Sequence, residues 1–103
     1  MKLLTKELEK NLVRQAKQNK FISDSSTEIA YVKFFDPTGS WTWYASEYNP
    51  ETKMFYGLVD GHEKELGYFS FDELLQLRLP MGLKIERDLY FEPRSLSELY
   101  REL

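Results

Sequence analysis

The chain has 103 residues, 42% hydrophobic and 30% charged, with a formal net charge of −3 at pH 7. This length and apolar content suit one folded domain over residues 1–103 and exclude a disordered chain. The absence of cysteine excludes disulfides, thiol nucleophiles, iron–sulfur clusters and thiolate zinc sites. No apolar run could cross a bilayer and the first residues do not resemble a signal peptide, so we expect a cytoplasmic protein without membrane contact.

The charge is distributed unevenly along the chain. Residues 1–20 carry six basic and two acidic side chains, a local charge of +4. Residues 21–103 carry eight basic and fifteen acidic side chains, a local charge of −7. The body of the protein therefore disfavours nucleic acid, whereas the N-terminal segment could contact it.

Residues 6–18 are predicted to form a helix, with Thr5 as its N-cap and Glu7 in its first turn. Apolar residues recur every four positions and share one face: Leu4, Leu8, Leu12 and Ala16. A basic stripe lies opposite them: Lys6, Lys10, Arg14 and Lys17. Either the apolar face docks on a sheet and the stripe is merely solvated, or the stripe meets phosphates, anionic head groups or an acidic protein. Residues 21–28 read as a polar connector to the rest of the domain, residues 29–103.

From residue 29 the hydrophobic period changes from that of a helix to two, which is typical of strands. Four strands are expected, at residues 29–35, 41–48, 53–59 and 65–70. The links "DPTGS", "NPET" and "DGHEK" have turn composition, and short links of this kind connect antiparallel strands. We therefore expect a meander.

Two capping boxes predict two short C-terminal helices. Ser70 with Glu73 begins a helix that stops before Pro80, and Ser95 with Glu98 begins a terminal one. A fifth strand is expected at residues 89–92 between them. The predicted class is α+β, a four- to five-stranded, mainly antiparallel meander sheet with an N-terminal amphipathic helix and two short C-terminal helices.

The aromatic residues could either pack in the core or form an exposed binding surface. Folding each hairpin about the centre of its turn places Phe35 opposite Trp41 and Lys33 opposite Trp43, the latter as a cation–π pair. The same map aligns Ala45, Gly57 and Gly67 on that face, with Val32 on the other. Four tyrosines lie on this second face: Tyr44, Tyr48, Tyr56 and Tyr68. Both faces are apolar, so packing is expected to take up most rings, and the Tyr-bearing side is the candidate for an exposed remainder.

Evidence for catalysis or a cofactor is thin in the sequence. His62, the single histidine, lies in a turn near Asp60 and Glu63, where solvation is the ordinary expectation. One histidine without cysteine serves zinc poorly, and phosphate-binding or nucleophile-elbow motifs are missing. We expect no enzyme activity, no catalytic residue, no metal site and no cofactor.

Long stretches of the chain match a pattern seen in other bacterial proteins. They are "KLLTKEL" (2–8), "YVKFFDPTGSWTWYASEYNPET" (31–52), "FYGLVDGHEKELGYFSFDEL" (55–74) and "GLKIERDLYFEPRSLSEL" (82–99). With them the chain resembles domain-of-unknown-function family 2958, apart from residues 9–28. The resemblance implies a context, since similar proteins are encoded on plasmids, phages and integrative conjugative elements near genes for DNA transfer, replication or antirestriction. It implies no activity or site residue.

Two functions from different classes follow from these features. The first is a non-catalytic accessory module of a mobile genetic element, acting through contact with an unidentified protein. Its expected surface consists of four tyrosines with two flanking acids: Tyr44, Tyr48, Tyr56, Tyr68, Glu47 and Glu51. The alternative is single-stranded nucleic-acid binding, with rings stacking on bases and the basic stripe on phosphates. A small hydrolase or transferase using His62 is a third possibility, and the sequence leaves the oligomeric state open.

Overall fold

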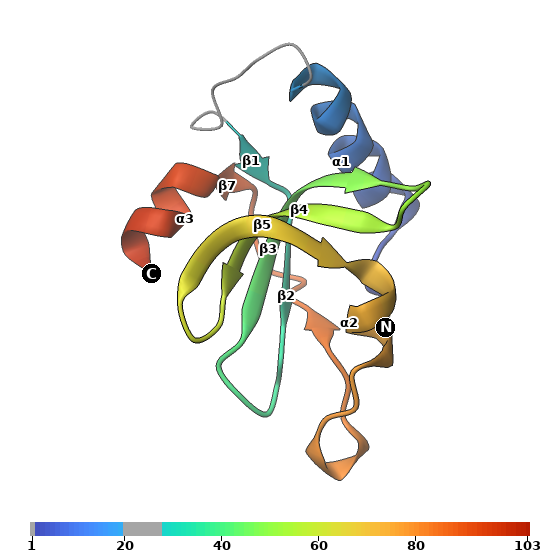
Figure 1. Ribbon diagram of the computed structural model, residues 1–103, viewed down its shortest axis with the longest axis vertical. Coiled ribbons are helices and arrows are strands. Elements are labelled where there is room, and N and C mark those ends of the chain that lie inside the picture. Colours follow the sequence, from blue (N-terminus) through green and yellow to red (C-terminus); the bar gives the residue numbers. More distant parts are fainter. Residues whose placement is uncertain (1, 20–27) are drawn as a thin grey trace.

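The computed structural model describes residues 2–19 and 28–103 and has the predicted α+β architecture (Figure 1). An antiparallel sheet contains, in spatial order, β5 (Lys64–Ser70), β4 (Met54–Asp60), β3 (Thr42–Asn49), β2 (Val32–Phe35) and β6 (Glu86–Arg87). A separate antiparallel pair joins β1 (Ile29–Ala30) and β7 (Arg94–Ser95). The helices are α1 (Lys6–Asn19), α2 (Phe71–Gln76) and α3 (Leu96–Glu102), with a 3-10 turn at Pro80–Gly82.

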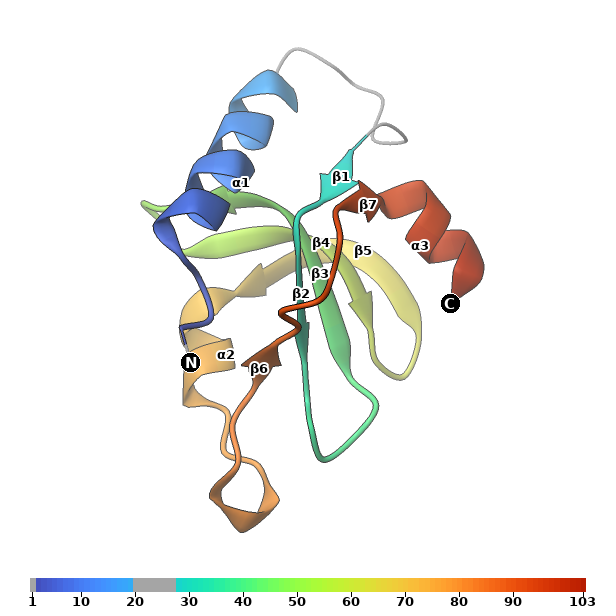
Figure 2. The same ribbon diagram turned by 180° about the vertical axis from the view of Figure 1, so that it is seen from behind.

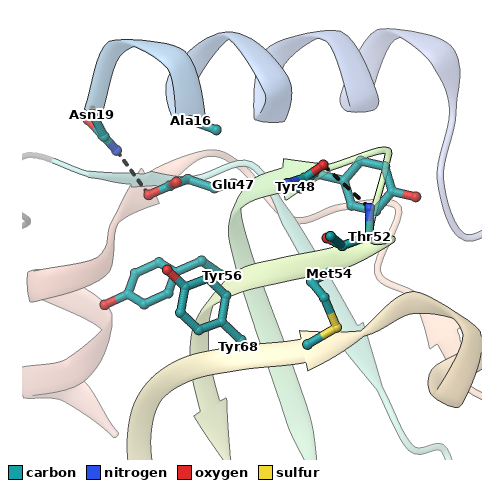
Figure 3. A pocket seen from close by; sticks show the side chains of 9 residues that line it. Ala16, Asn19, Glu47, Tyr48, Thr52, Met54, Tyr56 and Tyr68 are labelled. Carbon is teal, nitrogen blue, oxygen red and sulfur yellow. Dashed lines mark hydrogen bonds between the residues drawn. The ribbon is translucent and has the colours of Figure 1, made fainter. Parts of the chain in front are cut away.

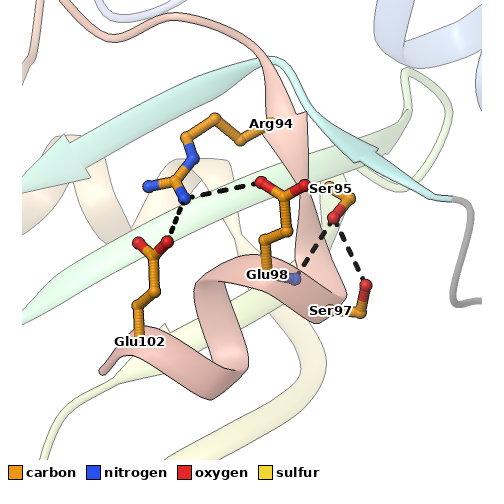
Figure 4. Close-up of polar contacts among 5 residues, drawn as sticks. All are labelled: Arg94, Ser95, Ser97, Glu98 and Glu102. Carbon is orange, nitrogen blue, oxygen red and sulfur yellow. Dashed lines mark hydrogen bonds and ion pairs between the residues drawn. The ribbon is translucent and has the colours of Figure 1, made fainter.

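Local capping determines where the three helices begin. The hydroxyl of Thr5 accepts a hydrogen bond from the amide of Leu8 at 3.2 Å, as predicted for an N-cap. Ser70 and Ser95 accept in the same way from Glu73 and Glu98, both at 3.2 Å. These contacts confirm both predicted caps, and Figure 4 shows the second one. There Arg94 also pairs with the carboxylates of Glu98 and Glu102 along α3.

The large sheet is covered on both faces, and most of the rings on its own strands are buried, as predicted. One face holds a core of Leu3, Leu12, Val32, Phe34, Trp43, Ala45, Tyr48, Phe55, Phe69, Leu74 and Ile85. The second core consists of Ala30, Tyr44, Leu58, Leu96 and Leu99. Helix α1 packs on β3 over the first core, where α2 contributes Leu74, whereas α3 covers the second (Figure 2). The predicted apolar face of α1 therefore docks on the sheet.

The predicted register of the first hairpin is wrong by one residue. Trp43 pairs with Phe34 rather than Lys33, and Ala45 pairs with Val32. The reason lies in the turn, where the Asp36 side chain accepts from the amide and hydroxyl of Thr38. Val32 thereby joins the core face, and Lys33 moves to the opposite one. Its ammonium lies 5.8 Å from the ring centre of Tyr44, so the predicted pair with Trp43 is not formed.

A bulge in β3 moves Tyr48 away from Tyr44. The β3–β4 register shifts between Ala45 and Glu47, which leaves Ser46 as an extra residue. Because a bulge reverses the alternation beyond it, Tyr48 pairs with Phe55 on the core face and is buried there. The expectation that Tyr48 shares a face with Tyr44 is therefore wrong. The predicted alignment of Ala45, Gly57 and Gly67 is confirmed.

The fifth strand also lies elsewhere than predicted. It is β6, which pairs with β2, whereas residues 89–92 form a turn and an irregular segment. The carboxylate of Asp88 accepts from the amide of Tyr90 at 2.9 Å, and the Asp88 carbonyl accepts from Phe91. Such a side-chain-to-backbone bond favours a turn over a strand despite the apolar residues that follow.

The neighbouring glycines of β4 and β5 give a matched test of this packing. A Cβ at Gly57 would lie 1.8 Å from the carbonyl oxygen of Tyr44, whereas one at Gly67 would have no neighbour within 4 Å. We expect Gly57→Ala to lower the free energy of unfolding by about 3 kcal/mol or more, because backbone must move. Gly67→Ala should change it by less than about 1 kcal/mol. Urea denaturation followed by circular dichroism measures both, and equal losses would contradict the packing.

Candidate functional site

A cluster of polar side chains is buried where α1 crosses the bulge of β3. We call it the polar cluster; its members are Gln15, Asn19, Glu28, Ser46 and Glu47. Gln15, Glu28 and Ser46 are buried, and Glu28 is only 3% exposed. Because buried polar groups need partners, the hydrogen bonds of the polar cluster account for its position.

Gln15 binds the backbone of two strands from the buried face of α1. Its amide nitrogen donates to the carbonyl oxygens of Ile29 at 2.8 Å and of Ser46 at 2.5 Å. Its side-chain oxygen accepts from the amide of Ile29 at 2.9 Å. The carbonyl of the bulged residue is thus satisfied by a helix side chain, since a bulge interrupts the ladder that would otherwise bind it. Gln15 therefore connects α1, β1 and β3.

Glu28 and Glu47 share a donor. The side-chain amide of Asn19 donates to Glu28 at 2.9 Å and to Glu47 at 3.2 Å. The pKa of Glu28 is raised from 4.5 to about 8, first by burial and then by the hydrogen bond to Glu47 and the negative charge of Glu47. Glu28 therefore holds a proton at neutral pH, and the two carboxyl groups act as one acid–carboxylate pair.

The hydroxyl of Ser46 lies between Glu28 and the backbone of β4. The Ser46 hydroxyl lies 3.0 Å from a carboxyl oxygen of Glu28 and 3.1 Å from the carbonyl oxygen of Tyr56. A hydroxyl carries one hydrogen and can serve one of these acceptors at a time. The hydrogen bonds that Ser46 and Asn19 donate to Glu28 lower its pKa, against the larger effects of burial and of Glu47.

A cleft of about 600 Å³ opens beside the polar cluster (Figure 3). Its walls come from the C-terminal end of α1, the β3 bulge, the following turn, and strands β4 and β5. The residues that line it include Asn19, Glu47, Tyr48, Met54, Tyr56 and Tyr68. The rings of Tyr56 and Tyr68 meet edge to face, 5.1 Å apart, and Tyr68 is 73% exposed. The cleft therefore joins an accessible aromatic pair to the carboxylate of Glu47.

A family model for proteins of unknown function (DUF2958) matches residues 3–102. The chain belongs to the DUF2958 family. Searches of curated proteins and of solved structures returned no match. Membership confirms the resemblance drawn from the sequence.

The DUF2958 fold brings four of the six predicted binding residues to one cleft. They are Glu47, Tyr48, Tyr56 and Tyr68. Tyr48 contributes little surface, because its ring is buried 4.7 Å from Phe55. Tyr44 is buried away from the cleft in the core under α3, 5.8 Å from Phe91. Glu51 is exposed in the turn after β3 and does not line the cleft.

The other predicted residues of the DUF2958 chain lie outside the cleft. The basic stripe is exposed on α1: Lys6, Lys10, Arg14 and Lys17. His62 packs edge-on against Trp41 with ring centres 5.3 Å apart. Among the described residues, no three His, Cys, Asp or Glu side chains could together hold a metal ion. No helix in residues 2–19 or 28–103 is long and apolar enough to cross a membrane. The predicted connector, residues 21–28, falls mostly outside the described residues.

Three residues of the polar cluster were not predicted from the DUF2958 sequence as site residues: Gln15, Asn19 and Glu28. The sequence does hold a signal for Gln15: it follows Leu12 by three positions and precedes Ala16, so a polar side chain lies on the apolar face of α1. Asn19 and Glu28 gave none, because they meet only once α1 is docked beside the start of β1.

The proton on Glu28 makes the stability of the DUF2958 fold depend on pH. Its pKa is about 8 in the folded chain against an ordinary value of 4.5, so stability is fully present below pH 4.5 and is lost as pH rises through 8. We expect Glu28→Gln to remove this loss, because an amide stays neutral. Between pH 5 and 8 the wild type should lose at least about 1 kcal/mol more than the variant in urea titrations. Glu51→Gln is the matched exposed control and should behave like the wild type; identical slopes for all three chains would contradict a buried proton.

Proposed function

We propose that this DUF2958 protein is a non-catalytic binding module that acts through protein–protein contact and takes a basic side chain of its partner into the cleft. The carrying observation is the accessible pair of Tyr56 and Tyr68 beside Glu47. The chemistry that fits is an arginine or lysine side chain on an exposed segment of the partner.

The aromatic pair supports a cation as ligand. A guanidinium or ammonium is attracted to the face of an aromatic ring, and the alkyl part of its side chain packs on the same surface. Tyr68 presents most of its ring to solvent, and Tyr56 supports that ring from the side. Met54 adds an apolar contact on the same wall of the cleft.

The carboxylate of Glu47 supports a positive charge on the ligand. Glu47 is held by Asn19 in the wall of the cleft, so its oxygens are positioned before a ligand arrives. An arginine that stacks on a ring and contacts a carboxylate uses both of its recognition modes at once. Phosphate would instead be repelled by Glu47 and by an acidic body with a charge of −7, which counts against single-stranded nucleic acid.

The polar cluster supports binding rather than catalysis. Glu28 has the raised pKa that acid–base chemistry uses, but it is 3% exposed and engaged by Asn19 and Ser46. A group so enclosed stabilises the bulge rather than reaching a ligand atom. The edge contact of His62 with Trp41 is likewise a packing role. The proposed setting is the cytoplasm of a bacterium carrying a mobile genetic element, as the family resemblance implies.

A titration with a blocked Gly-Arg-Gly peptide, followed by amide NMR, tests the proposal. The amides of Glu47, Tyr56 and Tyr68 should shift, with weak affinity because one side chain makes the contact. The blocked citrulline peptide, which has the same shape without the charge, should shift them much less. Tyr68→Ala should weaken binding about two- to fivefold, the range expected for an exposed cation–π contact.

Two matched controls separate the cleft from general charge attraction. Tyr90→Ala removes a tyrosine that is 92% exposed but distant from the lining residues, and it should leave affinity unchanged. Glu51→Gln should do the same, whereas Glu47→Gln should weaken binding. Equal shifts with the arginine and citrulline peptides would overturn the proposal. Shifts at the same amides with a mixed-sequence single-stranded oligonucleotide, falling steeply with salt, would favour the nucleic-acid alternative.

A further inference from the structure

The outer edge of β5 is a complete strand without a neighbour in the described part of the chain. β5 ends the strand order, pairs with β4 over all seven residues from Lys64 to Ser70, and has no register shift. The opposite edge, β6, is two residues long. Proteins commonly protect long edges with a proline, a bulge or a covering segment, because open backbone groups recruit another strand. Among residues 2–19 and 28–103, no helix or strand lies along the outer side of β5 in either view (Figures 1 and 2).

The side chains at the centre of this edge are apolar, whereas edge strands protected against pairing commonly carry charged residues. Leu66 is 45% exposed and Tyr68 is 73% exposed, and both point to the same face of the strand. Gly67 lies between them on the other face, where an added Cβ would meet nothing within 4 Å. The centre of the edge is therefore apolar on one face and unobstructed on the other.

We infer that β5 pairs antiparallel with β5 of a second copy of this chain about a two-fold axis through Gly67. This register pairs all seven residues, since Lys64 then lies opposite Ser70. It also places Leu66 opposite Tyr68 of the second copy, and the symmetry forms this contact twice. An aromatic ring opposite an aliphatic side chain is a favourable cross-strand pair, and both residues lose exposed apolar surface in it.

Charge and covering elements are compatible with this register. Glu65 lies opposite Phe69, so like charges are not placed directly across the new strand pair. At each end of the paired strands, α2 of one copy approaches α3 of the other. Leu74 of α2 belongs to the core on one face of the sheet, whereas Leu96 and Leu99 of α3 belong to the other. The two helices therefore lie on opposite faces of the continuous sheet and do not collide.

Sedimentation velocity over the micromolar range tests whether the dimer exists. A single strand pair is a small interface, so we expect a monomer–dimer equilibrium with a dissociation constant of about 10–500 µM. Leu66→Glu should shift it to monomer by at least about tenfold, because two carboxylates would be buried against tyrosine rings. Leu89→Glu is the matched control: Leu89 is 63% exposed and follows β6 at the opposite edge of the sheet, so the equilibrium should not change.

A cysteine scan tests the register in a chain that has no cysteine of its own. Directly opposite residues have Cα atoms about 4.5–5.5 Å apart, within the span of a disulfide, so Gly67→Cys should cross-link to itself on mild oxidation. Glu65→Cys is exposed on the same face, but its two copies would lie about 13 Å apart in this register, so it should stay monomeric. Amide NMR spectra of each variant confirm that the fold is retained.

Each outcome bears on the inference separately from the cleft. A monomer at all concentrations, or a dimer that Leu66→Glu leaves unchanged, would overturn it. Cross-linking of Glu65→Cys as fast as Gly67→Cys would overturn the two-fold register. Tyr68 belongs to both surfaces, so each test uses a variant that alters one surface alone: Glu47→Gln for the cleft and Leu66→Glu for the β5 edge. Failure of the peptide to bind leaves the dimer standing, and failure of the dimer leaves peptide binding standing.

Discussion

The extra residue at Ser46 is the constraint on which the rest of this structure depends. It divides β3 into two parts with opposite alternation, so that Trp43 and Tyr48 both reach the same core although five positions separate them. It also takes the carbonyl of Ser46 out of the regular strand ladder, so that this oxygen needs a donor from elsewhere. Gln15 supplies that donor, and the position of α1 follows from that bond as well as from its apolar face.

The same bulge explains why two carboxyl groups lie side by side. Glu47 follows the bulge and pairs with Tyr56 in the β4 ladder, which places it beside the start of β1. Glu28 enters from that segment, and its backbone carbonyl accepts from the amide of Leu96 at 2.9 Å. Both ends of Glu28 are therefore held, the carboxyl group by α1 and β3 and the backbone by α3. A retained proton lets one negative charge, rather than two, occupy this position.

Local patterns predicted the elements, and long-range contacts decided what the patterns left open. Thr5, Ser70 and Ser95 each cap a helix with atoms three residues away, so their roles are readable from short windows. The register of β2 is not readable in that way. A shift of one residue exchanges Lys33 with Phe34, and the choice rests on the Asp36 turn together with the space facing Trp43. The bulge was not predicted because nothing in the sequence around Ser46 marks it. It depends on the long-range contact with Gln15.

The candidate site was predictable to the same extent. Tyr56, Tyr68 and Glu47 were found because the β4–β5 pairing follows from a short turn and because aromatic residues alternate along both strands. Tyr44 was misplaced as surface, since its burial depends on α3 and on Phe91, which reach it from the far end of the chain. Glu28 could not be found, because its chemistry comes from burial rather than from a motif.

The position of Tyr68 connects the two surfaces of the molecule. Helices α1 and α3 cover the faces of the sheet, but a helix packed on a face does not protect an edge. Tyr68 lies at that edge, with one side of its ring against Tyr56 and most of the remainder in solvent. A tyrosine carries a large apolar area at little conformational cost, which suits a residue that is partly buried in one chain and able to bury more against another. Its exposure follows from the topology, because β5 ends the sheet and the chain turns directly into α2 at Phe71 instead of adding a further strand.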